Sequence, residues 1–165
     1  TGSLAQGYAA FTLPSGVFGY GVFRQSVPGK HDQEAVVPLS NQGALSNTLT
    51  WDDTTLVTAV SVVNPSSTAT TVNVTLWGES GSMIGTAMIA LPANGKTAAT
   101  LRSLPGLSAM VGQRGSAEFS VTAGSVAVLG LRFDGLAFTS IPTSSVSGSA
   151  ALDSPSPDSS WEKED

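Results

Sequence analysis

The single histidine of this 165-residue chain is the first residue to weigh for catalysis. His31 lies beside Asp32 and three residues before Glu34, so an imidazole and two carboxylates are close together in the sequence. A Ser-His-Asp site would also need a serine on a sharp strand-to-helix turn, and no Gly-x-Ser-x-Gly motif occurs in such a context. The surrounding Pro28-Gly-Lys-His-Asp32 is typical of an exposed loop between strands. We therefore expect no catalytic residue and no enzymatic activity.

Metal chemistry is restricted in the same way. The chain has no cysteine, which excludes thiolate nucleophiles and thiolate metal sites, and one histidine excludes sites that need two imidazoles. Asp52 and Asp53 could form a glycosidase pair or a calcium site, but neighbouring residues of a strand point to opposite faces and no Asp-x-Asp-x-Asp pattern is present. The pattern favours turn and strand-edge roles for the two carboxylates and predicts no cofactor. Weak calcium binding through Asp52 or Asp53 stays an alternative.

Two tryptophans are candidates for stacking against a sugar ring. Trp77 falls on the polar side of an alternating stretch, where an exposed ring would be unusual unless it is covered or used. Trp51 precedes the two aspartates. Both rings could instead pack in the core or beneath a loop, and we favour this structural role over stacking on a ligand.

Four polar residues are expected to have structural roles. Arg24, Glu34 and Arg132 lie in or next to strong strand patterns, and with so few charges in the chain we expect an ion pair between Glu34 and one of the two arginines. Asn64 precedes Pro65, and its amide is expected to hold the loop backbone through hydrogen bonds.

The elements that position these residues are predicted to be strands. Residues 70–77 alternate between Val72, Val74 and Leu76 on one side and polar residues on the other, a period of two that indicates a half-buried strand. The same pattern predicts strands at 7–13, 19–24, 34–39, 55–63, 83–91, 96–101, 115–122, 126–133 and 138–142. Between residues 102 and 112 the leucine spacing predicts at most one helical turn.

Composition agrees with a β-rich protein. Charged residues make up 12% of the chain against a usual value of about 25%, while 24 Ser and 17 Thr are present. About nine or ten strands with regular turns predict an all-β fold, an antiparallel two-sheet sandwich of immunoglobulin-like or jelly-roll-like type. We expect it to occupy residues 1–145.

Residues 146–165 differ from the rest. This Ser/Pro-rich stretch carries a net charge of −4, whereas the remaining residues are nearly neutral, so it is expected to be a tail or linker. Leu152 and Trp161 are its candidate anchors for an interaction. The nearly neutral body lacks a basic surface, which argues against nucleic-acid partners, and no apolar run is long enough to span a bilayer.

A series of short motifs resembles a known module. It includes Gly19-Tyr-Gly-Val-Phe-Arg24, Thr58-Ala-Val-Ser-Val-Val-Asn-Pro65, Leu91-Pro-Ala-Asn-Gly95 and Gly130-Leu-Arg-Phe133. Together they are similar to an extracellular β-sandwich module found in multidomain surface or secreted proteins of soil bacteria such as Acidobacteria. The resemblance covers about residues 5–143 and implies a β-sandwich outside the cell, without implying a reaction.

These observations lead to three functional hypotheses. The first is a non-catalytic structural or adhesive module of a cell-surface or secreted protein, with other domains or copies of the same protein as partners. The second is a subunit of an extracellular filament that exchanges a strand or the tail. The third is a carbohydrate-binding module that uses Trp51 or Trp77 and binds cell-surface glycans.

Overall fold

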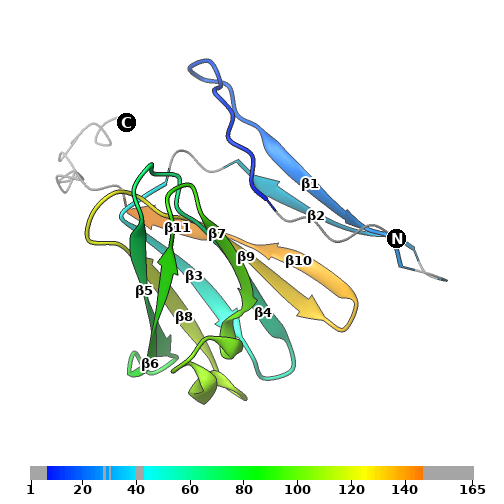
Figure 1. Ribbon diagram of the computed structural model, residues 1–165. Coiled ribbons are helices and arrows are strands. Elements are labelled where there is room, and N and C mark those ends of the chain that lie inside the picture. Colours follow the sequence, from blue (N-terminus) through cyan, green and yellow to red (C-terminus); the bar gives the residue numbers. More distant parts are fainter. Residues whose placement is uncertain (1–6, 28, 30, 40–42, 147–165) are drawn as a thin grey trace, which may run out of the picture.

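The computed structural model describes residues 7–27, 29, 31–39 and 43–146. These residues form eleven strands and two short 3-10 turns, joined by loops (Figure 1). The strands are β1 (Tyr20–Gln25), β2 (Gln33–Pro38), β3 (Ser46–Asp52), β4 (Val57–Val63), β5 (Thr70–Gly78), β6 (Met83–Leu91), β7 (Lys96–Thr100), β8 (Arg114–Ser120), β9 (Ala127–Asp134), β10 (Ala137–Ile141) and β11 (Thr143–Val146). The turns are η1 (Leu101–Ser103) and η2 (Ser108–Met110).

Nine of the strands form two antiparallel sheets. One sheet has the order β10-β9-β4-β7 and the other has the order β11-β3-β8-β5-β6. One cluster of buried apolar side chains draws on both sheets, including Val60, Val62 and Val128 from the first and Val74 and Phe119 from the second. The predicted all-β sandwich is confirmed.

Alternation along the strands creates this core. In β5, Val72, Val74 and Leu76 are buried while Thr71 and Asn73 are exposed, as the period of two predicts. In β4 the inward positions are Thr58, Val60 and Val62. Both strands thus contribute every second side chain to the space between the sheets.

The strands β1 and β2 form a separate hairpin outside the two sheets. Its two strands pair only with each other among the described residues, and β2 lies beside β10 (Figure 1). The hydroxyl of Ser140 in β10 donates a 2.7 Å hydrogen bond to the carbonyl oxygen of Val36. The hairpin is therefore attached along an edge of the sandwich instead of contributing to its core.

Four local details differ from the expectations. Residues 7–13 form no strand, although their sequence alternates. Residues 143–146, for which no strand was predicted, form β11, because they pair with β3 through a ladder that runs from Thr143–Leu49 to Val146–Ser46. The strand β3 itself was not predicted. The segment 102–112 contains two 3-10 turns, whereas at most one helical turn was predicted.

Among the described residues, no helix is long and apolar enough to cross a membrane.

Candidate functional site

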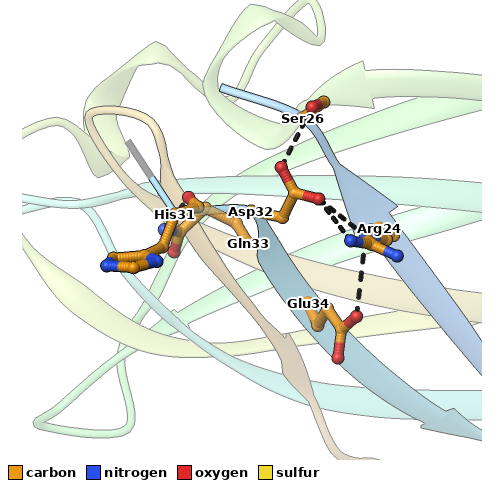
Figure 2. A network of polar contacts seen from close by, with 6 residues as sticks. All are labelled: Arg24, Ser26, His31, Asp32, Gln33 and Glu34. Carbon is orange, nitrogen blue, oxygen red and sulfur yellow. Dashed lines mark hydrogen bonds and ion pairs between the residues drawn. The ribbon is translucent and has the colours of Figure 1, made fainter. Parts of the chain in front are cut away.

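The tip of the β1–β2 hairpin carries a network of polar side chains (Figure 2). Arg24 and Glu34 are directly opposite in the ladder, and Arg24 Nε lies 3.8 Å from Glu34 Oε1. Asp32 is closer, since its Oδ2 lies 2.6 Å from Arg24 Nη2 and accepts a 2.8 Å hydrogen bond from Nε. Ser26 donates to Asp32 Oδ1 at 3.0 Å. The expected ion pair of Glu34 with an arginine is present, and Asp32 is the closer partner of that arginine.

This network is exposed, with 67% of the Arg24 side chain accessible to solvent. Ion pairs in such a setting contribute about 0–1 kcal/mol to stability. The contacts of the network connect the end of β1, at Arg24 and Ser26, to the start of β2, at Asp32 and Glu34. The His31 imidazole points away from Arg24, Asp32 and Glu34 (Figure 2), and the backbone carbonyl of His31 accepts a hydrogen bond from Gln33 Nε2. The structure therefore does not assemble the imidazole and the carboxylates into one site.

The other predicted arginine lies elsewhere. Arg132 is in β9, opposite Thr58 on one side and Thr139 on the other. Its Nε is buried and has no hydrogen-bond partner among the described residues. It therefore shares no site with Arg24 or Glu34.

Asn64 holds the loop that follows β4. Its side chain is fully buried, and its Nδ2 donates hydrogen bonds to the carbonyl oxygens of Thr68 at 2.7 Å and Pro92 at 2.9 Å. Its Oδ1 accepts a hydrogen bond from the backbone N–H of Ser66. The loop-holding hydrogen bonds predicted for this amide are all made to backbone atoms.

Asp52 is the last residue of β3 and Asp53 is the next residue, and their side chains lie on opposite sides of the chain. Asp52 Oδ1 accepts hydrogen bonds from Thr54 Oγ1 at 2.6 Å and from Thr54 N at 3.0 Å. These bonds are the main cause of a lowered pKa of Asp52, with smaller contributions from the charges of Arg114 and Arg132. The carboxylate thus closes a local turn at the surface.

Asp53 points inward. Its side chain is 1% exposed, Oδ2 lies 3.3 Å from Nη1 of Arg102, and neither carboxylate oxygen has a hydrogen-bond partner among the described residues. Burial raises the pKa of Asp53, against the opposing effect of the Arg102 charge. The two aspartates face apart, and no group of three or more His, Cys, Asp or Glu side chains within the described ranges could hold a metal ion.

The two tryptophans have different environments. Trp51 is 1% exposed and packs in the core between the sheets. Because no ligand can reach this ring, the prediction that Trp51 stacks on a sugar is wrong. Trp77 is 36% exposed, on the outer side of β5, in agreement with the alternation of the sequence. Leu152 and Trp161 lie outside the described residues.

The strand β3, which continues this sheet beyond β8, was not foreseen from the sequence. The alternation of Ser46-Asn-Thr-Leu-Thr-Trp-Asp52 could have indicated β3, because Asn47, Leu49 and Trp51 are buried while the residues between them face outward. The sequence did not indicate which strands lie next to each other in a sheet.

Comparisons of the chain with protein-family models, with curated proteins and with solved structures found no match.

Proposed function

We propose that this chain is a non-catalytic structural or adhesive module of a cell-surface or secreted protein, and that it attaches through apolar surface outside its core. The observation that carries the proposal is the distribution of exposed apolar side chains. Ten of the sixteen large apolar side chains that are exposed in the described residues lie between positions 8 and 39. Such a concentration marks an interaction surface in many proteins.

The hairpin arranges part of this surface into a strip. Tyr20 is opposite Pro38 and Val22 is opposite Val36, so these four side chains share one face, and all four are exposed. Side chains of directly opposite residues lie about 4.5–5.5 Å apart and so form a continuous surface. We name these four residues the hairpin strip.

A second apolar surface lies on the outer side of the four-stranded sheet. In β9 the inward positions are Val128 and Gly130, so the alternate residues Leu129, Leu131 and Phe133 face outward and are partly exposed. Phe133 stacks on Phe138 of β10 with ring centroids 5.9 Å apart. An outer sheet face would ordinarily be polar if it met only water.

The hairpin strip and this outer face suit each other as partners in two copies of the chain. Both are apolar, and burial of apolar area stabilises a complex by roughly 25 cal/mol per Å² before the cost of association. The nearly neutral body adds little repulsion between copies. The Ser/Thr-rich composition and the resemblance to an extracellular module support a location outside the cell.

The test is sedimentation of the chain over a range of concentrations. The double variant Val22→Thr, Val36→Thr keeps the shape of the hairpin strip and removes two methyl groups, which should weaken self-association about tenfold. Met88→Thr, at an exposed position of β6, is the matched control and should leave association unchanged. A chain that stays monomeric at every concentration, or a double variant that associates like the unchanged chain, would contradict the proposal.

The hairpin also supports a second candidate, a filament subunit assembled by strand exchange. The described contacts join β2 to β10 through one side-chain hydrogen bond and no backbone ladder. A hairpin held in this way could dock on the β10 edge of the next copy. Such a head-to-tail contact produces a filament when its rotation does not close the copies into a ring. Electron microscopy of concentrated protein should then show filaments, and their absence would leave the closed self-association above.

A further inference from the structure

The outer face of the five-stranded sheet presents polar side chains in a regular arrangement. Along β5 the outward residues are Thr71, Asn73, Thr75 and Trp77, because Val72, Val74 and Leu76 between them are buried. We name these four outward residues the β5 track. At about 3.4 Å per residue the track is roughly 20 Å long.

Hydroxyl groups continue from the track across neighbouring strands. Thr75 is opposite Thr86 of β6, and Trp77 is opposite Ser116 of β8. Beyond them, Ser116 is opposite Thr50 of β3. Neighbouring strands lie about 4.8 Å apart, so the face holds hydroxyls at short and repeated intervals.

Charge is nearly absent from the middle of this face. Glu118, opposite Thr75, is partly buried, and its Oε1 accepts a 3.0 Å hydrogen bond from Ser46 Oγ. Arg114 lies at the end of β8 and is paired with Glu79 at 2.7 Å. A face of hydroxyls with one engaged carboxylate suits a ligand that is itself uncharged and rich in hydroxyls.

The β5 track has a polar cavity at one end and an exposed aromatic ring at the other. At its start, Thr71 and Asn73 line a cavity of about 430 Å³ together with loop residues that include Ser66, Thr68 and Thr122. At its other end Trp77 offers an aromatic surface beside Met83, its partner in β6, which is 59% exposed. Polar groups that fix orientation and an apolar ring that contributes contact area are the features of a small-molecule site.

Trp77 is held in place from the neighbouring strand. Gly115 of β8 lies against the Trp77 carbonyl group so closely that an added Cβ would collide with the Trp77 oxygen. The pairing of β5 with β6 also shifts register between Leu76 and Trp77. The position of the backbone at Trp77 therefore depends on the pairing of three strands, β5, β6 and β8.

We propose that the β5 track binds an uncharged polysaccharide chain, with Trp77 stacking on a sugar ring and Asn73 and the adjacent hydroxyls bonding to sugar hydroxyls. This site lies on β5 and is distinct from the hairpin strip and the outer face of β9. If the chain does not bind polysaccharide, the self-association proposal is unaffected. If the chain does not self-associate, the polysaccharide proposal is likewise unaffected.

The experiment is calorimetric titration and affinity electrophoresis of the chain with a panel of mixed-linkage β-glucan, xylan, galactomannan, dextran and polygalacturonate. We expect binding to at least one of the four uncharged polymers, little change in 0.5 M salt, and no preference for polygalacturonate. Trp77→Ala should weaken that binding at least tenfold, and Asn73→Ala should weaken it several-fold. Both positions are at the surface, and circular dichroism checks that the variants keep their fold.

Val111→Ala is the matched control, because this apolar side chain is 55% exposed and lies at the end of η2, outside both the β5 track and the hairpin strip. It should bind the polysaccharide as the unchanged chain does. The proposal is overturned if none of the uncharged polymers binds, if polygalacturonate is preferred, or if Trp77→Ala and Asn73→Ala bind as tightly as the control.

Discussion

Oδ2 of Asp53 lies 3.3 Å from Nη1 of Arg102, and this ion pair joins the chain just after β3 to the turn η1. The carboxylate is buried, whereas 36% of the arginine side chain is exposed. The backbone N–H of Asp53 donates to Gln113 O at 2.9 Å, and its carbonyl accepts from Gly112 N at 3.1 Å. A charged group is thus placed where three loop segments meet at one end of the sandwich.

Asp53 should make the protein less stable as pH rises. Burial raises the folded-state pKa of Asp53 above its ordinary value of 3.8, so its contribution is fully present below that value and is lost as pH rises through the higher folded pKa. Asp53→Asn removes the titration. In urea unfolding, the stability of the variant relative to the unchanged chain should therefore increase from pH 3.5 to pH 7, and a constant difference would contradict the assignment.

Asp52 should show the opposite dependence. Hydrogen bonds from Thr54 lower the folded-state pKa of Asp52, so its contribution is present above the ordinary value of 3.8 and is lost as pH falls through the lower folded pKa. Asp52→Asn should therefore be less stable than the unchanged chain at pH 7, with the difference shrinking toward acid pH. Equal slopes for the two aspartate variants would show that the two environments are not distinct.

Removal of Arg102 should leave the buried carboxylate without its counter-ion. We expect Arg102→Met to lower the free energy of unfolding by about 1–2 kcal/mol at pH 7, a modest value because the arginine is partly exposed to solvent. In the background of Asp53→Asn the same substitution should cost less. A double-mutant cycle measured by urea unfolding checks this, and additive effects would mean that the two side chains do not interact.

The amide of Asn64 should be important for stability. Asn64→Ala removes three hydrogen bonds to backbone atoms in a fully buried position, for an expected loss of about 3 kcal/mol. Asn73→Ala is the matched control, because Asn73 is exposed on β5, and it should change stability by less than about 0.5 kcal/mol. Thermal or urea unfolding distinguishes the two, and equal losses would contradict the role of Asn64.

Two glycines with positive φ should respond differently to alanine. Gly106 has φ of 92°, and an added Cβ would collide with the carbonyl oxygen of Thr86 in β6. Gly112 has φ of 77° with open space around it. Gly112→Ala should cost about 1 kcal/mol from backbone strain alone, and Gly106→Ala at least twice as much. Unfolding measurements that rank them in the reverse order would contradict this contact.

Local sequence was enough to determine much of the fold. The period of two in β5 established which side chains are buried and left Trp77 outside, since a strand sends successive side chains to opposite faces. The Pro and Asn of Asn64-Pro65 indicated a loop held by an amide for an equally local reason. These properties depend on residues within a few positions of each other.

Tertiary structure alone decided which residues distant in the sequence came to share one face. Ser46 and Glu118 are 72 positions apart, yet they bond to each other on one sheet face. Trp51 is buried because the inward face of β3 packs against the other sheet, and Asp53 pairs with Arg102 in a turn that comes about fifty residues later. Alternation tells which side of a strand is apolar, but the strands that become its neighbours are set by packing between segments distant in the chain. For that reason the hairpin strip, and the hydroxyl groups of the strands beside the β5 track, became visible only in the folded molecule.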